Sequence, residues 1–405
     1  MPTVNQTAPS KHNPLDISRV FLIVLDGVGV GETHDAYLYG DTGANSIGNT
    51  ARAVGGLSLP NMQALGLGNL TDILGVPPRQ KTLGAYGKCA ELSEGKGSDV
   101  GHWELMGHVT EKAFPTYPDG FPEEILQPFR KRTGRGILAN RAASGTEIII
   151  ELGEEHLRTG DLIVYTSADS VFQIAANESI VPIEELYRYC EIAREILIDE
   201  HTVGRVIARP FEGTSRENFK RTDRRKDYPF MPPEKNIFDK LLDAGYQVYA
   251  TGKIDDLFGH RSISQSHHSV NNDVSIQSAI EFLSEPFSGI LMSNLIEFDM
   301  IYGHRNDPAG YARKLEEFDA YIPTIRSAMK TTDIVMIVAD HGVDPTTNST
   351  DHSREFIPLL VFGEQVEHNV NLGIRQTYAD VGATIAEIFS LPLPKFGSSF
   401  LSDIT

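Results

Sequence analysis

The chain has 405 residues, 40% of them hydrophobic and 22% charged, which supplies a sizeable core and excludes a wholly disordered chain. At roughly 100–200 residues per domain, this length predicts two or three domains. The formal net charge of −19, from 36 basic and 55 acidic residues, disfavours non-specific binding to nucleic acid or to an anionic membrane. A small anionic substrate stays compatible with this charge, because clustered arginines or a bound metal can make one cleft positive.

The number of cysteines and the distribution of apolar residues argue against a disulfide-rich, secreted or membrane-spanning protein. Cys89 and Cys190 are the only two cysteines, too few for a disulfide framework or a Cys-rich zinc site. The first nineteen residues are polar and lack the apolar region of a secretion signal. The longest apolar runs have six residues each, whereas a membrane span needs roughly twenty. We therefore expect a cytoplasmic protein with no membrane contact and a flexible N-terminal arm over residues 1–18.

Short apolar runs predict the strands of a sheet that is buried on both faces. In chain order they are Val20–Leu25, Gly245–Ala250, Gly289–Ile296 and Ile334–Ala339. Each run is too short for a helix and too apolar for a strand with one face in water. Helical spacing of apolar residues follows at 236–244, 311–329 and 380–389. Strands that alternate with helices indicate an α/β domain with a largely parallel sheet.

The middle of the chain has a different pattern, with Pro-rich and Arg-rich stretches from about residue 114 to 231. An amphipathic helix is predicted there at Ile183–Glu200. Strands are predicted at Glu147–Leu152, Leu162–Thr166 and Gly204–Ala208. This pattern predicts a smaller domain over 114–231, inserted into a core formed by 19–113 and 232–405.

The predicted core strands end at residues that can carry chemistry. Three strands are followed by Asp26, Asp299 and Asp340, and the fourth is followed by Lys253. Ligands of open α/β sheets bind beyond the carboxyl ends of the strands, so we expect these side chains to meet in one cleft.

Histidines near the same strand ends complete a candidate metal centre. The six residues are Asp26, Asp299, His304, Asp340, His341 and His352. They make two sets of three ligands, and oxygen and imidazole ligands without thiolate favour Mn²⁺, Mg²⁺ or Zn²⁺. Two such ions about 4 Å apart suit phosphoryl transfer. Taken singly, a strand-end Asp is more often a turn or helix-capping residue, and a lone His is usually structural.

A Gly-rich segment offers a candidate nucleophile. Gly95–Glu104 reads Gly-Lys-Gly-Ser-Asp-Val-Gly-His-Trp-Glu, with Ser98 near its centre. Such a segment can place a hydroxyl at a helix N-terminus, where free N–H groups favour phosphate. Coordination to a divalent ion would activate the hydroxyl. An ordinary loop with a helix-capping serine is the alternative.

Basic residues in this acidic chain form a candidate anion pocket. They are Arg205, Arg209, Arg221, Arg225 and the strand-end residue Lys253. Arginine forks match phosphate oxygens, although most such residues simply form a solvated basic face. Ser167 and Asp169 follow a predicted strand and would suit sugar hydroxyls.

Four segments resemble the prokaryotic-type phosphopentomutases of the alkaline phosphatase superfamily, from about Arg19 to the C-terminus. These segments are Gly101–Glu104, Tyr165–Ala176, Gly204–Phe211 and Ala339–Thr346. The resemblance implies an α/β, alkaline-phosphatase-like core with a largely parallel sheet between helices, plus a smaller inserted α/β cap domain. It also implies interconversion of the 1- and 5-phosphates of ribose and deoxyribose, with pentose phosphates as the small-molecule partners.

The resemblance further implies two Mn²⁺ ions, with Mg²⁺ or Zn²⁺ as possible replacements, and roles for single residues. Asp26, Asp340 and His341 would hold one ion, and Asp299, His304 and His352 the other. Ser98 stands where the family has its nucleophilic Thr and would carry the phosphoryl group. The sugar would contact Ser167 and Asp169, and its phosphate would contact Arg205, Arg221 and Lys253. A sugar bisphosphate such as glucose 1,6-bisphosphate or ribose 1,5-bisphosphate would act as the activator.

The sequence departs from the family at the reacting centre. Ser98 replaces Thr, Gly97 replaces Asp, and Gly27 stands where the family usually has Ser. These changes leave alternatives open: a related metal-dependent mutase or phosphatase with a different substrate, a cofactor-independent phosphoglycerate mutase, or a non-catalytic phosphosugar sensor. The segment Tyr165–Ala176 argues against the second, and the intact ligand set argues against the third.

Overall fold

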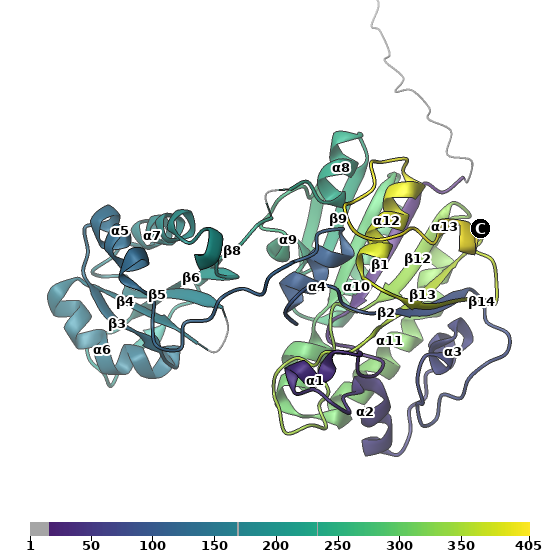
Figure 1. The fold of residues 1–405 in the computed structure, drawn as a ribbon, viewed down its shortest axis with the longest axis horizontal. Coiled ribbons are helices and arrows are strands. Elements are labelled where there is room, and N and C mark those ends of the chain that lie inside the picture. Colours follow the sequence, from purple (N-terminus) through teal and green to yellow (C-terminus); the bar gives the residue numbers. More distant parts are fainter. Residues whose placement is uncertain (1–15, 168–169, 233) are drawn as a thin grey trace, which may run out of the picture. The chain divides into compact units, whose positions relative to one another are not determined.

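The computed structural model describes residues 16–167, 170–232 and 234–405. Within these ranges the chain divides into two compact units. The core unit runs to Glu111 and resumes after residue 233, and the inserted unit comprises Lys112–Pro232. The inserted unit therefore interrupts the core unit in sequence (Figure 1).

Within the described residues, the core unit contains an eight-stranded sheet in the order β10-β9-β11-β1-β12-β13-β2-β14. The strands are β1 (Arg19–Leu25), β2 (Ala85–Cys89), β9 (Gln247–Gly252), β10 (Gln265–His268), β11 (Gly289–Leu295), β12 (Asp333–Val338), β13 (Ile357–Gly363) and β14 (Val370–Arg375). From β10 to β12 all neighbours are parallel, whereas β13 is antiparallel to both of its neighbours. Every residue of β1, β11 and β12 is buried, as expected for strands covered on both faces.

Two groups of helices cover this sheet. One group has α11 in contact with α2, α3 and α10, and in the other α12 contacts α4 and α8. The helices of the core unit are α1 (Ala36–Tyr39), α2 (Ser46–Val54), α3 (Pro60–Leu65), α4 (Ser98–Leu105), α8 (Ile237–Asp243), α9 (Ile254–Leu257), α10 (Asn272–Ser284), α11 (Pro308–Ala328), α12 (Ala379–Ile388) and α13 (Leu401–Ile404). Because the central strands are buried on both faces, the sheet lies between the two groups.

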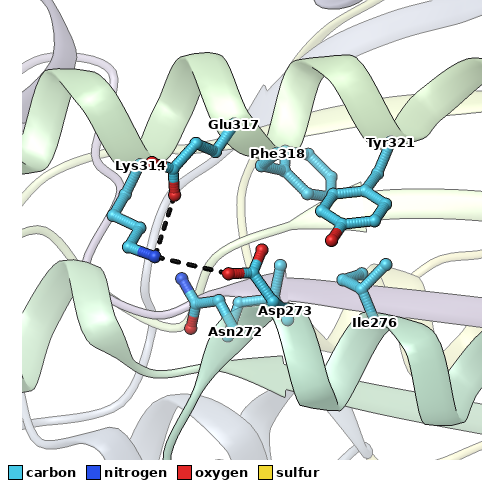
Figure 2. A pocket seen from close by; sticks show the side chains of 8 residues that line it. Asn272, Asp273, Ile276, Lys314, Glu317, Phe318 and Tyr321 are labelled. Atoms are coloured by element: carbon cyan, nitrogen blue, oxygen red, sulfur yellow. Dashed lines mark ion pairs between the residues drawn. The ribbon is translucent and has the colours of Figure 1, made fainter.

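A small hollow between α10 and α11 is lined by eight residues, three of which are charged (Figure 2). Lys314 of α11 pairs with Glu317 at 2.8 Å and with Asp273 of α10 at 3.7 Å. The hollow has a volume of about 10 Å³, which is room for about one water molecule. The hollow is too small to hold a sugar phosphate.

The predicted core elements are observed, with small shifts at their ends. The strand expected at Gly245–Ala250 begins at Gln247, because Gly245 adopts a left-handed conformation with φ of 86° after α8. The π-helical turn η3 (Phe298–Tyr302) and the short 3₁₀ turn η4 (Gly303–Arg305) follow β11. Within the described residues, no helix is long and apolar enough to cross a membrane.

The inserted unit has its own sheet, in the order β3-β4-β5-β6-β7, with β8 also paired to β6. Its elements are α5 (Glu123–Thr133), β3 (Ile137–Ala142), α6 (Gly145–Thr159), β4 (Leu162–Thr166), β5 (Val171–Asn177), α7 (Ile183–Ile196), β6 (Arg205–Glu212), β7 (Lys220–Arg221) and β8 (Lys226–Pro229). A hydrophobic core joins α5 and α7 to this sheet, and a smaller one joins α6 to it.

One prediction in the inserted unit is wrong. The strand expected at Glu147–Leu152 lies inside helix α6. The run Ile148-Ile149-Ile150 has the β-branched composition of a strand. Yet Ile148, Ile149 and Leu152 have helical spacing, and their contacts with the sheet decide the conformation.

Candidate metal centre

Three adjacent parallel strands bring three carboxylates to one edge of the core sheet. β1 lies between β11 and β12, with Val24 opposite Asn294 on one side and Val338 on the other. Asp26 and Asp340 follow β1 and β12, and Asp299 lies in η3 after β11. Parallel strands end at the same edge, so the three acids meet there, as predicted.

Three side chains of the predicted ligand set, Asp299, His304 and His352, are linked by short contacts. Oδ1 of Asp299 lies 3.2 Å from Nε2 of His304 and 3.2 Å from Nε2 of His352. These three residues form one group of candidate ligand atoms, all within 4.8 Å of one another, and Asp26, Asp299 and His341 form a second. Asp299 thus belongs to both groups.

Asp340 lies next to the second group. Nε2 of His341 is 3.3 Å from Oδ2 of Asp340 and 3.4 Å from Oδ1 of Asp26. The structure therefore brings together all six residues of the predicted metal centre, with Asp299 rather than Asp340 completing the second compact group.

The three imidazoles are oriented by their backbone contacts. The Nδ1 atoms of His304, His341 and His352 lie 2.6, 3.0 and 2.6 Å from carbonyl oxygens of Thr350, Gly342 and Lys96. A carbonyl can only accept, so each Nδ1 donates its hydrogen. Each neutral imidazole then presents the lone pair of Nε2 to the cluster, as a metal ligand must.

Buried atoms without partners fit divalent cations. Among the described residues, the buried side-chain atoms that lack a hydrogen-bond partner include Asp26 Oδ1, Asp299 Oδ1, Asp340 Oδ2 and His352 Nε2. Buried polar atoms are rarely left unpaired, because the desolvation cost is high. These four atoms belong to predicted ligands and lie in one cluster, so their oxygen and imidazole donors fit a metal site.

The same contacts shift pKa values. The contact with Asp299 raises the pKa of His304 to about 9. Burial raises the pKa of Asp299, but the contacts with His304 and His352 outweigh burial, so its pKa falls well below the usual range. A divalent cation would replace protons in this network, because it binds the deprotonated imidazole.

Ser98 lies beside this cluster. It is the first residue of α4, as the Gly-rich segment predicted, and its hydroxyl lies 2.8 Å from Nε2 of His341. Gly101 lets α4 approach the end of β12, because a Cβ atom there would lie 2.0 Å from the carbonyl oxygen of Asp340. The packing of α4 therefore fixes the hydroxyl next to the candidate ligands.

Comparison with known proteins places the chain in a family. A model of the metalloenzyme superfamily matches residues 18–393. Phosphopentomutase from Herpetosiphon aurantiacus is 57% identical over 390 residues, covering 96% of this chain and all of the relative. Phosphopentomutase from Caldanaerobacter subterraneus is 55% identical, covering 96% of this chain and 98% of the relative. The chain belongs to the phosphopentomutase family.

Because it belongs to this family, the chain is an enzyme of the isomerase type in the alkaline phosphatase superfamily. Members of that superfamily depend on divalent metals. Family membership also confirms the predicted fold class, an α/β core with an alkaline-phosphatase-like sheet. Among solved structures, Leishmania mexicana phosphoglycerate mutase is similar over 97% of this chain and 99% of that chain, with a TM-score of 0.46 and 14% identity.

Two buried residues that the sequence analysis did not assign contact candidate ligands and the candidate nucleophile. Asn294 donates a hydrogen bond of 2.8 Å from Nδ2 to Oδ2 of Asp26. Nδ1 of His102 lies 2.7 Å from the carbonyl oxygen of Ser98 and 3.2 Å from Oδ2 of Asp340. A polar side chain inside the apolar β11 run was the signal for Asn294, and the Gly-His-Trp-Glu motif was the signal for His102.

The predicted phosphate contacts are distributed over both units. Lys253 lies in the core unit at the start of α9, with Nζ 3.8 Å from Sδ of Met300. In the inserted unit, Arg205 begins β6 and forms an ion pair with Asp227 at 3.6 Å. Arg221 lies on β7, where it is the strand neighbour of Phe211 near the other end of β6.

The predicted sugar contacts lie after β4. Ser167 directly follows Thr166, the last residue of that strand, and is half-buried. Asp169 lies outside the described residues. Arg209, which also belongs to the predicted basic cluster, donates a hydrogen bond of 3.0 Å to Gln173.

Proposed function

We propose that the enzyme interconverts the 1- and 5-phosphates of ribose and deoxyribose through a phosphorylated Ser98 and a pentose 1,5-bisphosphate. The observation that carries this proposal is the hydroxyl of Ser98, 2.8 Å from His341 and beside a cluster of unpartnered ligand atoms. Relatives named phosphopentomutase at more than half identity support the same reaction.

Two divalent ions, Mn²⁺ in the first instance, would be held by the six residues of the centre. Asp299, His304 and His352 would hold one, and Asp26, Asp340 and His341 the other, with Asp299 close to both. When bound, the ions supply charge neutralisation at the phosphoryl oxygens and favour the alkoxide form of a coordinated hydroxyl. Mg²⁺ and Zn²⁺ suit the same donors.

Ser98 would exchange the phosphoryl group with the substrate. In the first step the bond between the phosphorus and the Ser98 oxygen breaks, and a bond to the free hydroxyl of the pentose monophosphate forms. After the bisphosphate reorients, the Ser98 oxygen bonds to the other phosphorus atom, the bond from that phosphorus to the sugar oxygen breaks, and the sugar oxygen takes up the proton that the serine hydroxyl loses. The N-terminus of α4 favours the negative charge on this group throughout. A sugar bisphosphate such as glucose 1,6-bisphosphate or ribose 1,5-bisphosphate would load Ser98 at the start.

The remaining predicted residues would orient the sugar and keep water out. Arg205, Arg221 and Lys253 would bind the phosphate that is not transferred, and Ser167 and Asp169 the sugar hydroxyls. The inserted unit would act as a cap that protects the phosphorylated serine and the bisphosphate from hydrolysis. The cytoplasm, where pentose phosphates occur, would be the site of the reaction.

Incubation with Mn²⁺, glucose 1,6-bisphosphate and ribose 5-phosphate, followed by ³¹P NMR, tests the reaction. The proposal predicts a ribose 1-phosphate signal with conserved organic phosphate. Net release of inorganic phosphate would instead favour a phosphatase of the same superfamily. Gly97 motivates this second candidate, because position 97, directly before Ser98, carries no carboxylate, whereas the family usually has Asp there.

A further inference from the structure

Arg354 is a buried arginine that lies two residues after the candidate metal ligand His352. Its side chain is 3% exposed, so its charge is removed from water. Nε lies 3.1 Å from Oδ2 of Asp35, and Nη1 lies 2.7 Å from Oε2 of Glu91. The two acids therefore compensate the buried charge.

The same guanidinium holds the chain that leads to Ser98. Nη1 donates to the carbonyl oxygens of Ser93 and Gly95, both at 2.8 Å. Nη2 donates to the carbonyl oxygen of Glu91 at 2.9 Å. One planar group thus binds three alternate carbonyls of the segment 91–95.

His352 and Asp41 extend this contact to the next residue. Nδ1 of His352 donates to the carbonyl oxygen of Lys96 at 2.6 Å. Asp41 accepts from the backbone N–H of Arg354 at 2.9 Å and pairs with Nζ of Lys96 at 3.2 Å. The segment 352–354 therefore carries a candidate metal ligand and also holds the backbone that precedes Ser98.

The segment before Ser98 needs such support because its own sequence is permissive. Gly95 has a φ of 118°, in the region that favours glycine, and Gly97 precedes Ser98 directly. Glycines add backbone freedom, and a displacement of about 1 Å at a reacting group can lower a rate about 100-fold. External hydrogen bonds to this segment therefore contribute, together with the packing of α4, to the position of the serine hydroxyl.

We propose that Arg354 is a positioning residue that fixes the Ser98 hydroxyl relative to the metal centre by holding the carbonyls of residues 91, 93 and 95. The inference rests on the proposed role of Ser98 as the phosphoryl carrier. Arg354 acts through the backbone, since its guanidinium contacts two carboxylates and three carbonyls, and none of these belongs to a candidate metal ligand.

Arg354→Lys tests this role, since an ammonium keeps the charge and loses the planar fork that reaches three carbonyls. Arg19→Lys is the matched control. Arg19 is also about 1% exposed, pairs with Asp333 and donates to the carbonyl oxygen of Leu283, at the opposite end of β1 from Asp26. Both variants should lower the melting temperature.

Only Arg354→Lys should lower kcat, by about 100-fold, with KM within twofold of the wild type and metal content unchanged by elemental analysis. An unchanged kcat, or an equal loss in Arg19→Lys, would show that Arg354 is merely structural. If Arg354→Lys fails to fold, Asp41→Asn loosens the same segment and should lower kcat in the same way. A wild-type kcat for that variant would overturn the proposal.

Ser98→Ala separates this inference from the proposed function. Loss of activity in Ser98→Ala together with an unaffected Arg354→Lys would reject the role of Arg354 alone. Full activity in Ser98→Ala would reject Ser98 as the phosphoryl carrier, and with it the basis of the inference.

Discussion

Gly101 and Asp340 approach each other through their backbones, and this contact joins α4, which begins at Ser98, to the segment that follows β12. A Cβ atom on residue 101 would lie 2.0 Å from the carbonyl oxygen of Asp340, a distance that no side chain can occupy. The glycine of the Gly-His-Trp-Glu motif thus serves close packing rather than chain flexibility. The position of Ser98 depends on it, since both residues lie on α4.

Gly101→Ala should therefore push α4 away from β12 and move the Ser98 hydroxyl. We expect kcat to fall by about 10–100-fold, because catalysis depends on the alignment of the reacting oxygen. The bound metal, measured by elemental analysis, should stay close to the wild-type amount. A variant with normal kcat would show that the helix can shift without moving the hydroxyl.

Asn294→Ala should weaken metal binding at the side of the centre formed by Asp26. The amide holds Oδ2 of Asp26 at 2.8 Å and leaves Oδ1 to face the cluster. Loss of a residue that orients a ligand typically lowers metal affinity about 10–100-fold. Titration with Mn²⁺ followed by electron paramagnetic resonance should show one weakened and one normal site.

Ser293→Ala is the control for that variant, because Ser293 precedes Asn294 in β11 and pairs with Thr251. Two wild-type affinities in Asn294→Ala would remove Asn294 from any role in orienting Asp26. Equal weakening in Ser293→Ala would point to a general effect on the strand.

Glu355 gives a pH dependence to stability. Burial raises the pKa of Glu355 from 4.5 to about 7, although Ser46 and Ser353 donate hydrogen bonds to it. A group whose pKa is raised by folding binds more protons in the folded state, so its contribution to stability is complete below pH 4.5 and is lost as the pH rises to about 7. Glu355→Gln lacks this titration.

Urea unfolding at pH values from 5 to 8 measures this effect. The wild type should lose stability relative to Glu355→Gln as the pH rises from 5 to 8, so the gap between the two free energies of unfolding should be smallest at the acid end, where the protonated acid resembles the neutral Gln, and largest at pH 8. A difference that stays constant over this range would mean that Glu355 titrates normally in the folded chain.

Arg221→Ala should raise KM for ribose 5-phosphate strongly, with a smaller effect on kcat. Its guanidinium donates to Thr146 at 2.8 Å and is otherwise exposed, so it is available to a phosphate. Arg216→Ala, on the same unit and paired with Glu154, is the control. Wild-type KM in Arg221→Ala, measured in initial-rate assays, would count against a substrate contact.

The sequence was sufficient for four neighbouring strands of the core sheet, β9, β11, β1 and β12, and for the edge where the candidate ligands lie. The strands before Asp26, Asp299 and Asp340 are short apolar runs, and the edge where parallel strands end is a general property of α/β sheets. The prediction of a strand at Glu147–Leu152 was wrong because a local run of isoleucines fits either a strand or a helix. Only the packing of these side chains decides between the two.

The residues that support the centre could not be assigned from the sequence. The contacts of Asn294, His102 and Arg354 depend on the direction of side chains from different elements, which no spacing along the chain reveals. The sequence also did not show that Asp299 belongs to both candidate groups. Its position depends on the π-helical turn after β11.

Phosphorylation of Ser98 is the central claim, and peptide mapping by mass spectrometry tests it most directly. The protein is incubated with Mn²⁺ and glucose 1,6-bisphosphate, quenched and digested, with Ser98→Ala treated in parallel. The account predicts one phosphoryl group on the peptide that contains Ser98 and none in the variant. A protein that isomerises ribose 5-phosphate while Ser98 stays unmodified, or that carries the phosphoryl group on another residue, would contradict it.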